Sequence, residues 1–105
     1  MTNNLIKTPE LIEKGINLVD KIYDKVFCIF SNTDFGYDTE EKNIYEGILI
    51  SVEFAVRNSK LDWVATVKIG ESTCIRIWSE NFENKVFFNK EIAQKIYEME
   101  TSLNE

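Results

Sequence analysis

The stretch from Ile48 to Trp78, ILISVEFAVRNSKLDWVATVKIGESTCIRIW, carries the alternation of apolar and polar residues that decides the fold. Side chains of a β-strand point alternately to its two faces, so a period of two is typical of a strand with one buried face. The pattern predicts three such strands in succession. Their core-facing residues are Ile48, Ile50, Val52, Phe54 and Val56, then Leu61, Trp63, Ala65, Val67 and Ile69, then Ile75 and Ile77.

Two short links join these strands, and they predict an antiparallel meander. Residues directly opposite each other in an antiparallel pair lie on one face, so apolar residues should pair with apolar residues. We expect a tight link at 59–60 and a three-residue link at 70–72, in which Gly70 supplies a positive φ. The expected pairs are Val56 with Trp63, Phe54 with Ala65, Val52 with Val67, Ile50 with Ile69, Val67 with Ile75, and Ala65 with Ile77.

Helical patterns flank the meander on both sides. Thr8, Pro9 and Glu10 have the character of an N-cap, a first helical residue and a first-turn acid, which predicts a helix over about 9–24. Asn89 similarly predicts the start of a C-terminal helix. The apolar stripe of that helix steps by about four, three and four residues. It consists of Ile92, Ile96, Met99 and Leu103.

Short aromatic and β-branched runs at 26–30 and 86–88 complete the set of predicted elements, because such runs are typical of buried strands. The sequence therefore predicts a two-layer α+β fold, with an antiparallel four- or five-stranded meander sheet and one helix at each end. The 105 residues fit a single domain over 1–105, with 1–7 and 104–105 frayed.

The charge balance limits the classes of partner. The chain has 18 acidic and 12 basic residues, a net charge of −6, which repels phosphate backbones and anionic lipid surfaces. We therefore expect no nucleic-acid and no membrane partner. No apolar run has the length of a signal peptide or a membrane span, so the expected location is cytoplasmic.

The residue types also limit the chemistry. The chain contains no histidine, which removes the commonest general base and the commonest metal ligand. Cys28 and Cys74 lie in apolar stretches where buried, inert thiols are usually found, with a disulfide between them as the alternative. The four glycines are scattered and form no phosphate-binding loop. We expect no metal, no cofactor and no catalysis, and a carboxylate-only enzyme using Asp34, Asp38, Glu40 and Glu41 is the rival hypothesis.

An acidic segment with interleaved aromatic residues is the first candidate site. Aromatic rings supply contact area in an interface, and surrounding carboxylates steer a basic partner and fix its orientation. A solvated loop whose tyrosines anchor it to the core is the alternative. The candidate partner-binding residues are Asp34, Phe35, Tyr37, Asp38, Glu40, Glu41, Tyr45 and Glu46, in a segment expected to be a loop over 34–46.

The sheet face opposite the core is the second candidate surface. The predicted register brings Ala55, Val64 and Trp78 into a row on this face, and an exposed tryptophan there would indicate a contact surface. A helix covering this side of the sheet is the alternative. The candidate residues are Glu53, Val64, Arg76 and Trp78.

The acidic stretch from Asp34 to Glu41, DFGYDTEE, is similar in character to what the immunity proteins of bacterial contact-dependent inhibition toxins and colicins present. The whole chain resembles that class, which is united by role. The resemblance implies a tight one-to-one complex with a cognate toxin, no cofactor and no catalysis. We therefore expect a small acidic inhibitor that blocks a basic protein, such as a nuclease toxin or another nucleic-acid-handling enzyme.

Three alternatives remain open at this point. A phage-encoded inhibitor of a nucleic-acid-targeting defence enzyme would have the same character. A self-assembly subunit would join copies through the open sheet edge or the Trp78 face. A carboxylate-dependent enzyme would use the acidic residues directly. An inhibitor is expected to be a monomer, or at most a modest dimer, when it is alone.

Overall fold

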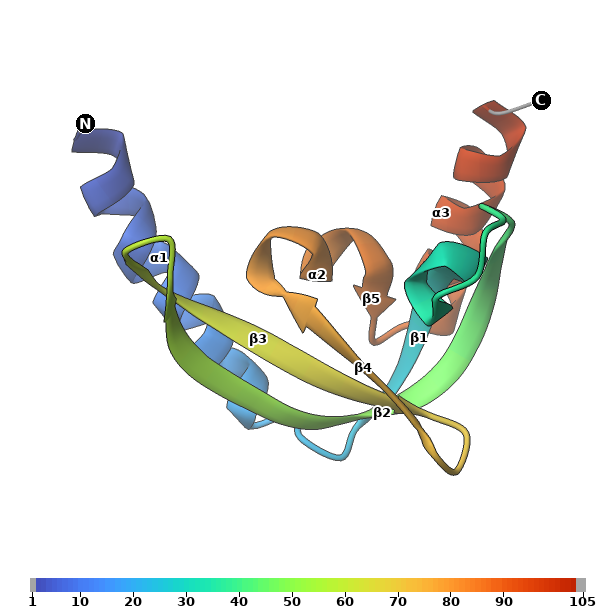
Figure 1. Ribbon diagram of the computed structural model, residues 1–105, viewed down its shortest axis with the longest axis horizontal. Helices are drawn as coiled ribbons and strands as arrows, with labels where there is room; N and C mark the ends of the chain where they lie inside the picture. The colour runs from blue at the N-terminus through green and yellow to red at the C-terminus, as the bar shows by residue number, and fades with distance from the viewer. Residues whose placement is uncertain (1, 104–105) are drawn as a thin grey trace.

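The computed structural model describes residues 2–103 and contains three α-helices, one 3-10 helix and five strands (Figure 1). The helices are α1 (Thr2–Val19), η1 (Asn32–Phe35), α2 (Ser79–Lys85) and α3 (Lys90–Leu103). The strands are β1 (Lys25–Ser31), β2 (Lys42–Arg57), β3 (Lys60–Ile69), β4 (Thr73–Trp78) and β5 (Val86–Phe87). They form one antiparallel sheet in the order β4-β3-β2-β1-β5, which confirms the two-layer α+β fold. Met1 and residues 104–105, which we expected to be frayed, lie outside the described residues.

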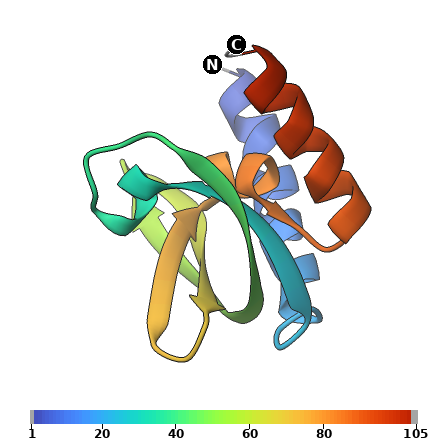
Figure 2. The same cartoon turned by 90° about the vertical axis from the view of Figure 1, so that its right-hand side faces the viewer.

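The long strand β2 bends so strongly that the sheet forms a trough (Figure 1). In Figure 1, α2 stands between α1 and α3, and in Figure 2 α1 and α3 lie side by side on the right of most of the sheet. Both α1 and α2 contribute to the main hydrophobic core, through Leu18 and Phe82, and this core lies on the sheet face that carries Trp63, Ala65 and Val67. The two helices therefore cover that face of β3.

The β2–β3 hairpin has a register two residues away from the predicted one. Val56 pairs with Leu61 and Phe54 with Trp63, instead of Val56 with Trp63. The turn lies at Asn58–Ser59, both with positive φ (55° and 64°), one residue earlier than expected. A two-residue turn of this kind matches the right-handed twist of the strands, and asparagine tolerates the left-handed region. Because the shift is by two, residues from Ser51 to the turn keep their predicted face.

A β-bulge between Leu49 and Ser51 reverses the pleat in the first half of β2. One extra residue in a strand exchanges its inward and outward positions beyond that point. Leu49 is therefore fully buried opposite Val67, whereas Ile48, predicted to face the core, is exposed. The prediction of Ile48 as a core residue was wrong for this reason, while Ile50, the extra residue of the bulge, is half-buried. Near the β2–β3 turn, Phe54, Val56 and Leu61 were also predicted to be core residues and are exposed.

The β3–β4 hairpin has the predicted register, with Val67 opposite Ile75 and Ala65 opposite Ile77. Gly70 in its turn has the expected positive φ of 68°.

Both cysteines are free, and burial raises the pKa of the Cys28 thiol to about 12. Cys74 was predicted to be buried but is exposed, because it points away from the core on the edge strand β4.

The helix α1 is longer at its start and shorter at its end than predicted. It begins at Thr2, so Thr8 is not its N-cap and Pro9 lies inside it. The fixed φ of proline is helical, but the residue removes one backbone hydrogen bond and its ring crowds the carbonyl one turn earlier. The helix nevertheless continues through Pro9. The helix ends at Val19, and the turn after it brings Tyr23, with φ of 78°, to donate its N–H to Leu49 O at 2.6 Å.

The C-terminal region contains a helix that the sequence analysis did not identify, α2, between β4 and β5. The start of α3 is as predicted, because Asn89 Oδ1 accepts hydrogen bonds from the N–H groups of Glu91 and Ile92, at 2.8 and 3.1 Å. The predicted apolar stripe is the buried face only in part: Ile96 is half-buried, and the side chain of Leu103 lies outside the described residues. Ile92 and Met99 are exposed, and the helix instead buries Ala93.

Candidate partner-binding site

The acidic candidate segment begins with η1, which a capping box holds at its start. Asp34 Oδ2 accepts hydrogen bonds from the Ser31 N–H at 2.8 Å and from the Ser31 hydroxyl at 3.2 Å. Gly36 ends this turn with φ of 91°, a conformation that glycine adopts at little cost. The chain therefore leaves β1 through a defined turn.

We call residues 36–41, between η1 and β2, the acidic tip. Asn32 braces it from both sides, because its N–H donates to Glu41 O at 3.0 Å and its Nδ2 donates to the Thr39 hydroxyl at 2.7 Å. Its carbonyl oxygen accepts a third bond from the Tyr37 N–H at 3.0 Å. A braced loop loses less conformational entropy when it binds a partner.

Four of the predicted binding residues project from the acidic tip into solvent. Tyr37 is 69% exposed, and the three acidic residues that follow it in the sequence, Asp38, Glu40 and Glu41, are also exposed. Within the described part of the chain, none of these three carboxylates makes an ion pair. The tip therefore presents one aromatic ring together with uncompensated negative charge.

Two of the predicted binding residues instead anchor the tip. Phe35 and Tyr45 pack edge-on at 5.0 Å between ring centroids, and Phe35 packs edge-on against Phe30 at 5.8 Å. Phe30 is fully buried in the main core. The three rings join the tip to the sheet, which is the anchoring role weighed as the alternative for the tyrosines.

The remaining two acidic candidates are paired with lysines. Glu46 lies in β2, not in a loop, since the strand begins at Lys42; its Oε2 lies 3.3 Å from Lys25 Nζ. Asp34 Oδ1 accepts a 2.7 Å hydrogen bond from Lys85. Burial opposes ionisation of Asp34, but the Lys85 ammonium and the Ser31 N–H outweigh it, so the pKa of this carboxyl lies below its ordinary value of 3.8.

Replacing Asp34 with asparagine is expected to lower the free energy of unfolding by about 1 kcal/mol at neutral pH, because a charged acceptor of three hydrogen bonds is lost. The folded-state pKa is depressed, so this stabilisation is complete above the unfolded pKa and is lost as pH falls through the folded one. Urea unfolding of both proteins from neutral pH to below 3.8 measures this. The difference should shrink with acid, whereas the exposed Asp38→Asn control should change little throughout. A difference that stays constant with pH would exclude the charge of Asp34 as its cause.

The second candidate surface includes one predicted pair, Val64 with Trp78, but Ala55, predicted to lie in the same row, pairs with Asp62 because of the two-residue register shift. Glu53, Val64 and Trp78 are in register across β2, β3 and β4, and the Arg76 guanidinium lies 3.8 Å from Glu53. Val64 is fully buried, so its prediction as a residue of an exposed contact surface was wrong. The Arg57 guanidinium lies over the Trp78 ring at 4.4 Å from its centroid, so a side chain partly covers this tryptophan.

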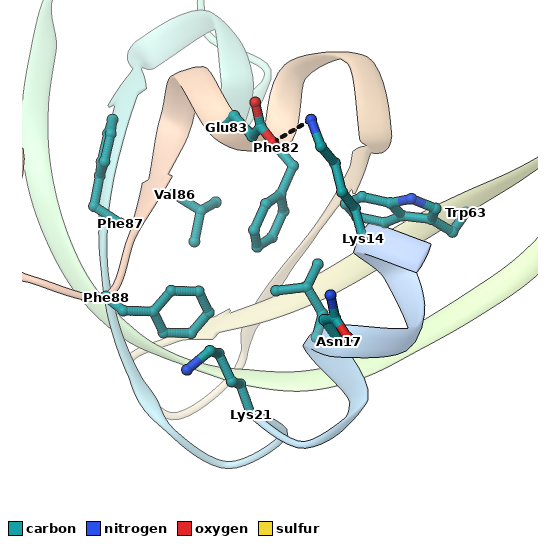
Figure 3. A pocket seen from close by; sticks show the side chains of 10 residues that line it. Lys14, Asn17, Lys21, Trp63, Phe82, Glu83, Val86, Phe87 and Phe88 are labelled. Carbon is teal, nitrogen blue, oxygen red and sulfur yellow. Dashed lines mark ion pairs between the residues drawn. The ribbon is translucent and has the colours of Figure 1, made fainter. Parts of the chain in front are cut away.

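A pocket that the sequence analysis did not identify lies between α1, α2 and the segment 86–88 (Figure 3). Its volume is about 360 Å³. Its walls are largely apolar, and Lys14 of α1 pairs with Glu83 of α2 at 2.8 Å at its rim. The lining residues are Lys14, Asn17, Leu18, Lys21, Trp63, Phe82, Glu83, Val86, Phe87 and Phe88. They come from distant parts of the chain, and α2 was not expected, so no local sequence pattern indicated this pocket.

The fold and these surfaces define a small two-layer α+β protein with an exposed, braced acidic loop. Searches of protein-family models, curated proteins and solved structures found no match to the chain. Within residues 2–103, no helix has both the length and the apolar character to cross a membrane. The described residues also include no cluster of three metal-ligating side chains.

Proposed function

We propose that this protein is a non-catalytic inhibitor of the immunity type, which binds a basic protein through the acidic tip. The observation that carries the proposal is the exposed ring of Tyr37 beside the carboxylates of Asp38, Glu40 and Glu41 on a braced loop. Tyrosine is enriched among residues that dominate binding energy, and unpaired carboxylates steer a basic partner during its approach. The partner would be a nucleic-acid-handling enzyme, such as a nuclease toxin, whose phosphate-binding surface the tip covers.

The tip carboxylates are better suited to binding than to catalysis. The pKa of a catalytic acid or base is tuned by burial and by neighbouring groups, and these three side chains are exposed and unpaired among the described residues.

Self-assembly is the rival function with a specific observation in its favour. β4 is an edge strand, with no partner on its outer side within residues 2–103. Light scattering on the purified chain separates the two, since a self-assembly subunit would be an oligomer when it is alone.

The proposal is tested by reversing the charge of the tip. With the partner captured from a lysate and purified, the double variant Glu40→Lys and Glu41→Lys is expected to associate about tenfold more slowly at low salt, with a weaker salt dependence. Stopped-flow or surface-plasmon measurements give the association rate. The matched control is Glu13→Lys with Glu71→Lys, two exposed positions on α1 and in the β3–β4 turn.

The control variant changes the net charge by the same amount, so it separates steering by the tip from a general charge effect. The proposal requires a slower rate for the tip variant alone, a basic partner that handles nucleic acid, and loss of that partner's activity in the complex. Equal rates for the two double variants would exclude the tip from the interface. A partner that stays active when bound would exclude inhibition.

A further inference from the structure

The pocket between α1 and α2 has aromatic walls that belong to several elements. Trp63 of β3 and Phe82 of α2 pack edge-on at 5.4 Å between ring centroids, and Val86 and Phe88 close the opposite side (Figure 3). Leu18 of α1 adds a further apolar wall. The volume of about 360 Å³ falls within the range of pockets that hold small organic molecules. The size and lining of the pocket suit a small apolar group.

The rim of the pocket is positive in a protein that is otherwise acidic. It carries two lysines, Lys14 and Lys21, against one carboxylate, Glu83. Glu83 is engaged by Lys14, and this contact raises the pKa of the Lys14 ammonium. Within the described residues, Lys21 has no carboxylate within 4.0 Å, and its ammonium lies 5.2 Å from the centroid of the Phe88 ring. Lys21 is therefore the cation left to pair with a ligand.

We propose that this pocket binds a small apolar carboxylate, with the apolar body among Trp63, Phe82 and Phe88 and the carboxylate on the Lys21 ammonium. Asn17, in the last turn of α1, also lines the pocket and adds an amide donor, while Lys21 lies in the turn that follows the helix. Exposed cation–π contacts are weak, so an incoming carboxylate displaces the contact between Lys21 and Phe88 at low cost. This site is separate from the acidic tip and does not depend on the function proposed for it.

The choice of a carboxylate follows from the charge of the rim. A cationic ligand would meet the Lys21 ammonium, which repels it. A neutral ligand would fill the apolar walls but would leave Lys21 unpaired. A charge-assisted hydrogen bond between ammonium and carboxylate is stronger than a neutral one, so the anion gains affinity that its uncharged analogue lacks.

Phenylpropanoate and phenylpropanol are suitable probes, because they share the aromatic body and differ in charge. Titrations followed by ¹H–¹⁵N NMR are expected to shift the Trp63 indole N–H, which donates to Leu11 O at 2.8 Å beside the pocket. Phenylpropanoate should bind about fivefold more tightly than the alcohol. Lys21→Met should abolish this difference, while the exposed Lys95→Met on α3 should retain it.

A blocking variant tests the place of binding independently of charge. Asn17 is exposed on α1, so Asn17→Trp is expected to leave the fold intact, by circular dichroism, and to block both probes. Equal affinity of the acid and the alcohol, or an unchanged preference in Lys21→Met, would overturn the proposal and leave a pocket for apolar side chains of a partner. Absence of a shift at the Trp63 indole with millimolar phenylpropanoate would also overturn it.

Discussion

Replacing Gly47 with alanine is expected to lower the free energy of unfolding by about 3 kcal/mol, although it adds a single methyl group. Gly47 lies in β2 between two paired strands, opposite Val26 of β1 and Ile69 of β3. A Cβ at this position would lie 2.6 Å from Lys68 O and 2.6 Å from Ile69 Cδ1. The carbonyl belongs to the backbone of the sheet, so it cannot move aside as a flexible side chain can. Urea unfolding followed by circular dichroism measures the loss.

Gly70→Ala is the matched control for this prediction. A Cβ at Gly70 would meet nothing within 4 Å, so the only cost is its positive φ of 68°, about 1 kcal/mol for alanine. If the two variants were equally destabilised, close packing of β2 against β3 would not explain the need for glycine at 47. If Gly47→Ala were neutral, the sheet at this point would have to be more adaptable than its paired geometry indicates.

The meander was predictable from the sequence because apolar and polar residues alternate along three successive strands. This pattern assigns one face of each strand to the core and the other to solvent. The β3–β4 register was correct, since a three-residue link with one glycine left few arrangements. The β2–β3 register was not, because pairs such as Val56 with Trp63 and Val56 with Leu61 satisfy the apolar pattern equally well. Only the turn geometry distinguishes registers that differ by two residues.

The bulge at Leu49–Ser51 could not be predicted, because Ile48, Leu49 and Ile50 are all apolar. A run without alternation fits either face, and the choice is made by long-range pairing with Val67 on β3. The acidic loop is shorter than expected because the start of β2 pairs with β1. Residues from Lys42 onward join β1, which leaves only the acidic tip in solvent.

The buried face of α3 shows the same dependence on tertiary contacts. Its stripe of Ile92 and Met99 has helical spacing, yet the helix turns the small Ala93 toward the protein. The Tyr97 hydroxyl donates to Lys42 O at 3.2 Å, and Lys42 Nζ lies 3.0 Å from Glu100 Oε1. These contacts with the start of β2 fix the rotation of α3, and the apolar pattern alone does not contain them.

The candidate sites divide in the same way. The exposed residues of the acidic segment could be recognised from their charge and spacing, since they are neighbours in the sequence and surface loops are polar. The paired members, Asp34 and Glu46, could not, because their lysines at 85 and 25 are distant in the sequence. The covering of Trp78 by Arg57 likewise follows from the fold of the β2–β3 hairpin. Composition identifies available groups, and only the topology shows which of them are already engaged.

Replacing Trp63 with alanine is expected to cost about 4 kcal/mol, a large share of the stability of a domain of this size. The side chain is 2% exposed and connects three elements. Its ring packs against Phe82 of α2, its Nε1–H donates to Leu11 O of α1, and α1 approaches so closely that a Cβ at Gly15 would lie 2.7 Å from Trp63 Cδ1. Removing the indole leaves a cavity at the junction of β3 with both helices, and chemical denaturation measures the loss.

Trp78, the other tryptophan of the chain, is the control for the stability cost of Trp63→Ala. Trp78 is only partly covered, by the Arg57 guanidinium, so Trp78→Ala should cost about 1 kcal/mol. Trp63→Phe retains a ring but loses the bond to Leu11 O, so it should cost about 2 kcal/mol and remain measurable if the alanine variant does not fold. If Trp63→Phe cost no more than Trp78→Ala, Trp63 would not be the residue that holds α1 against the sheet. The pocket wall that it forms would then depend on Phe82 and Leu18 instead.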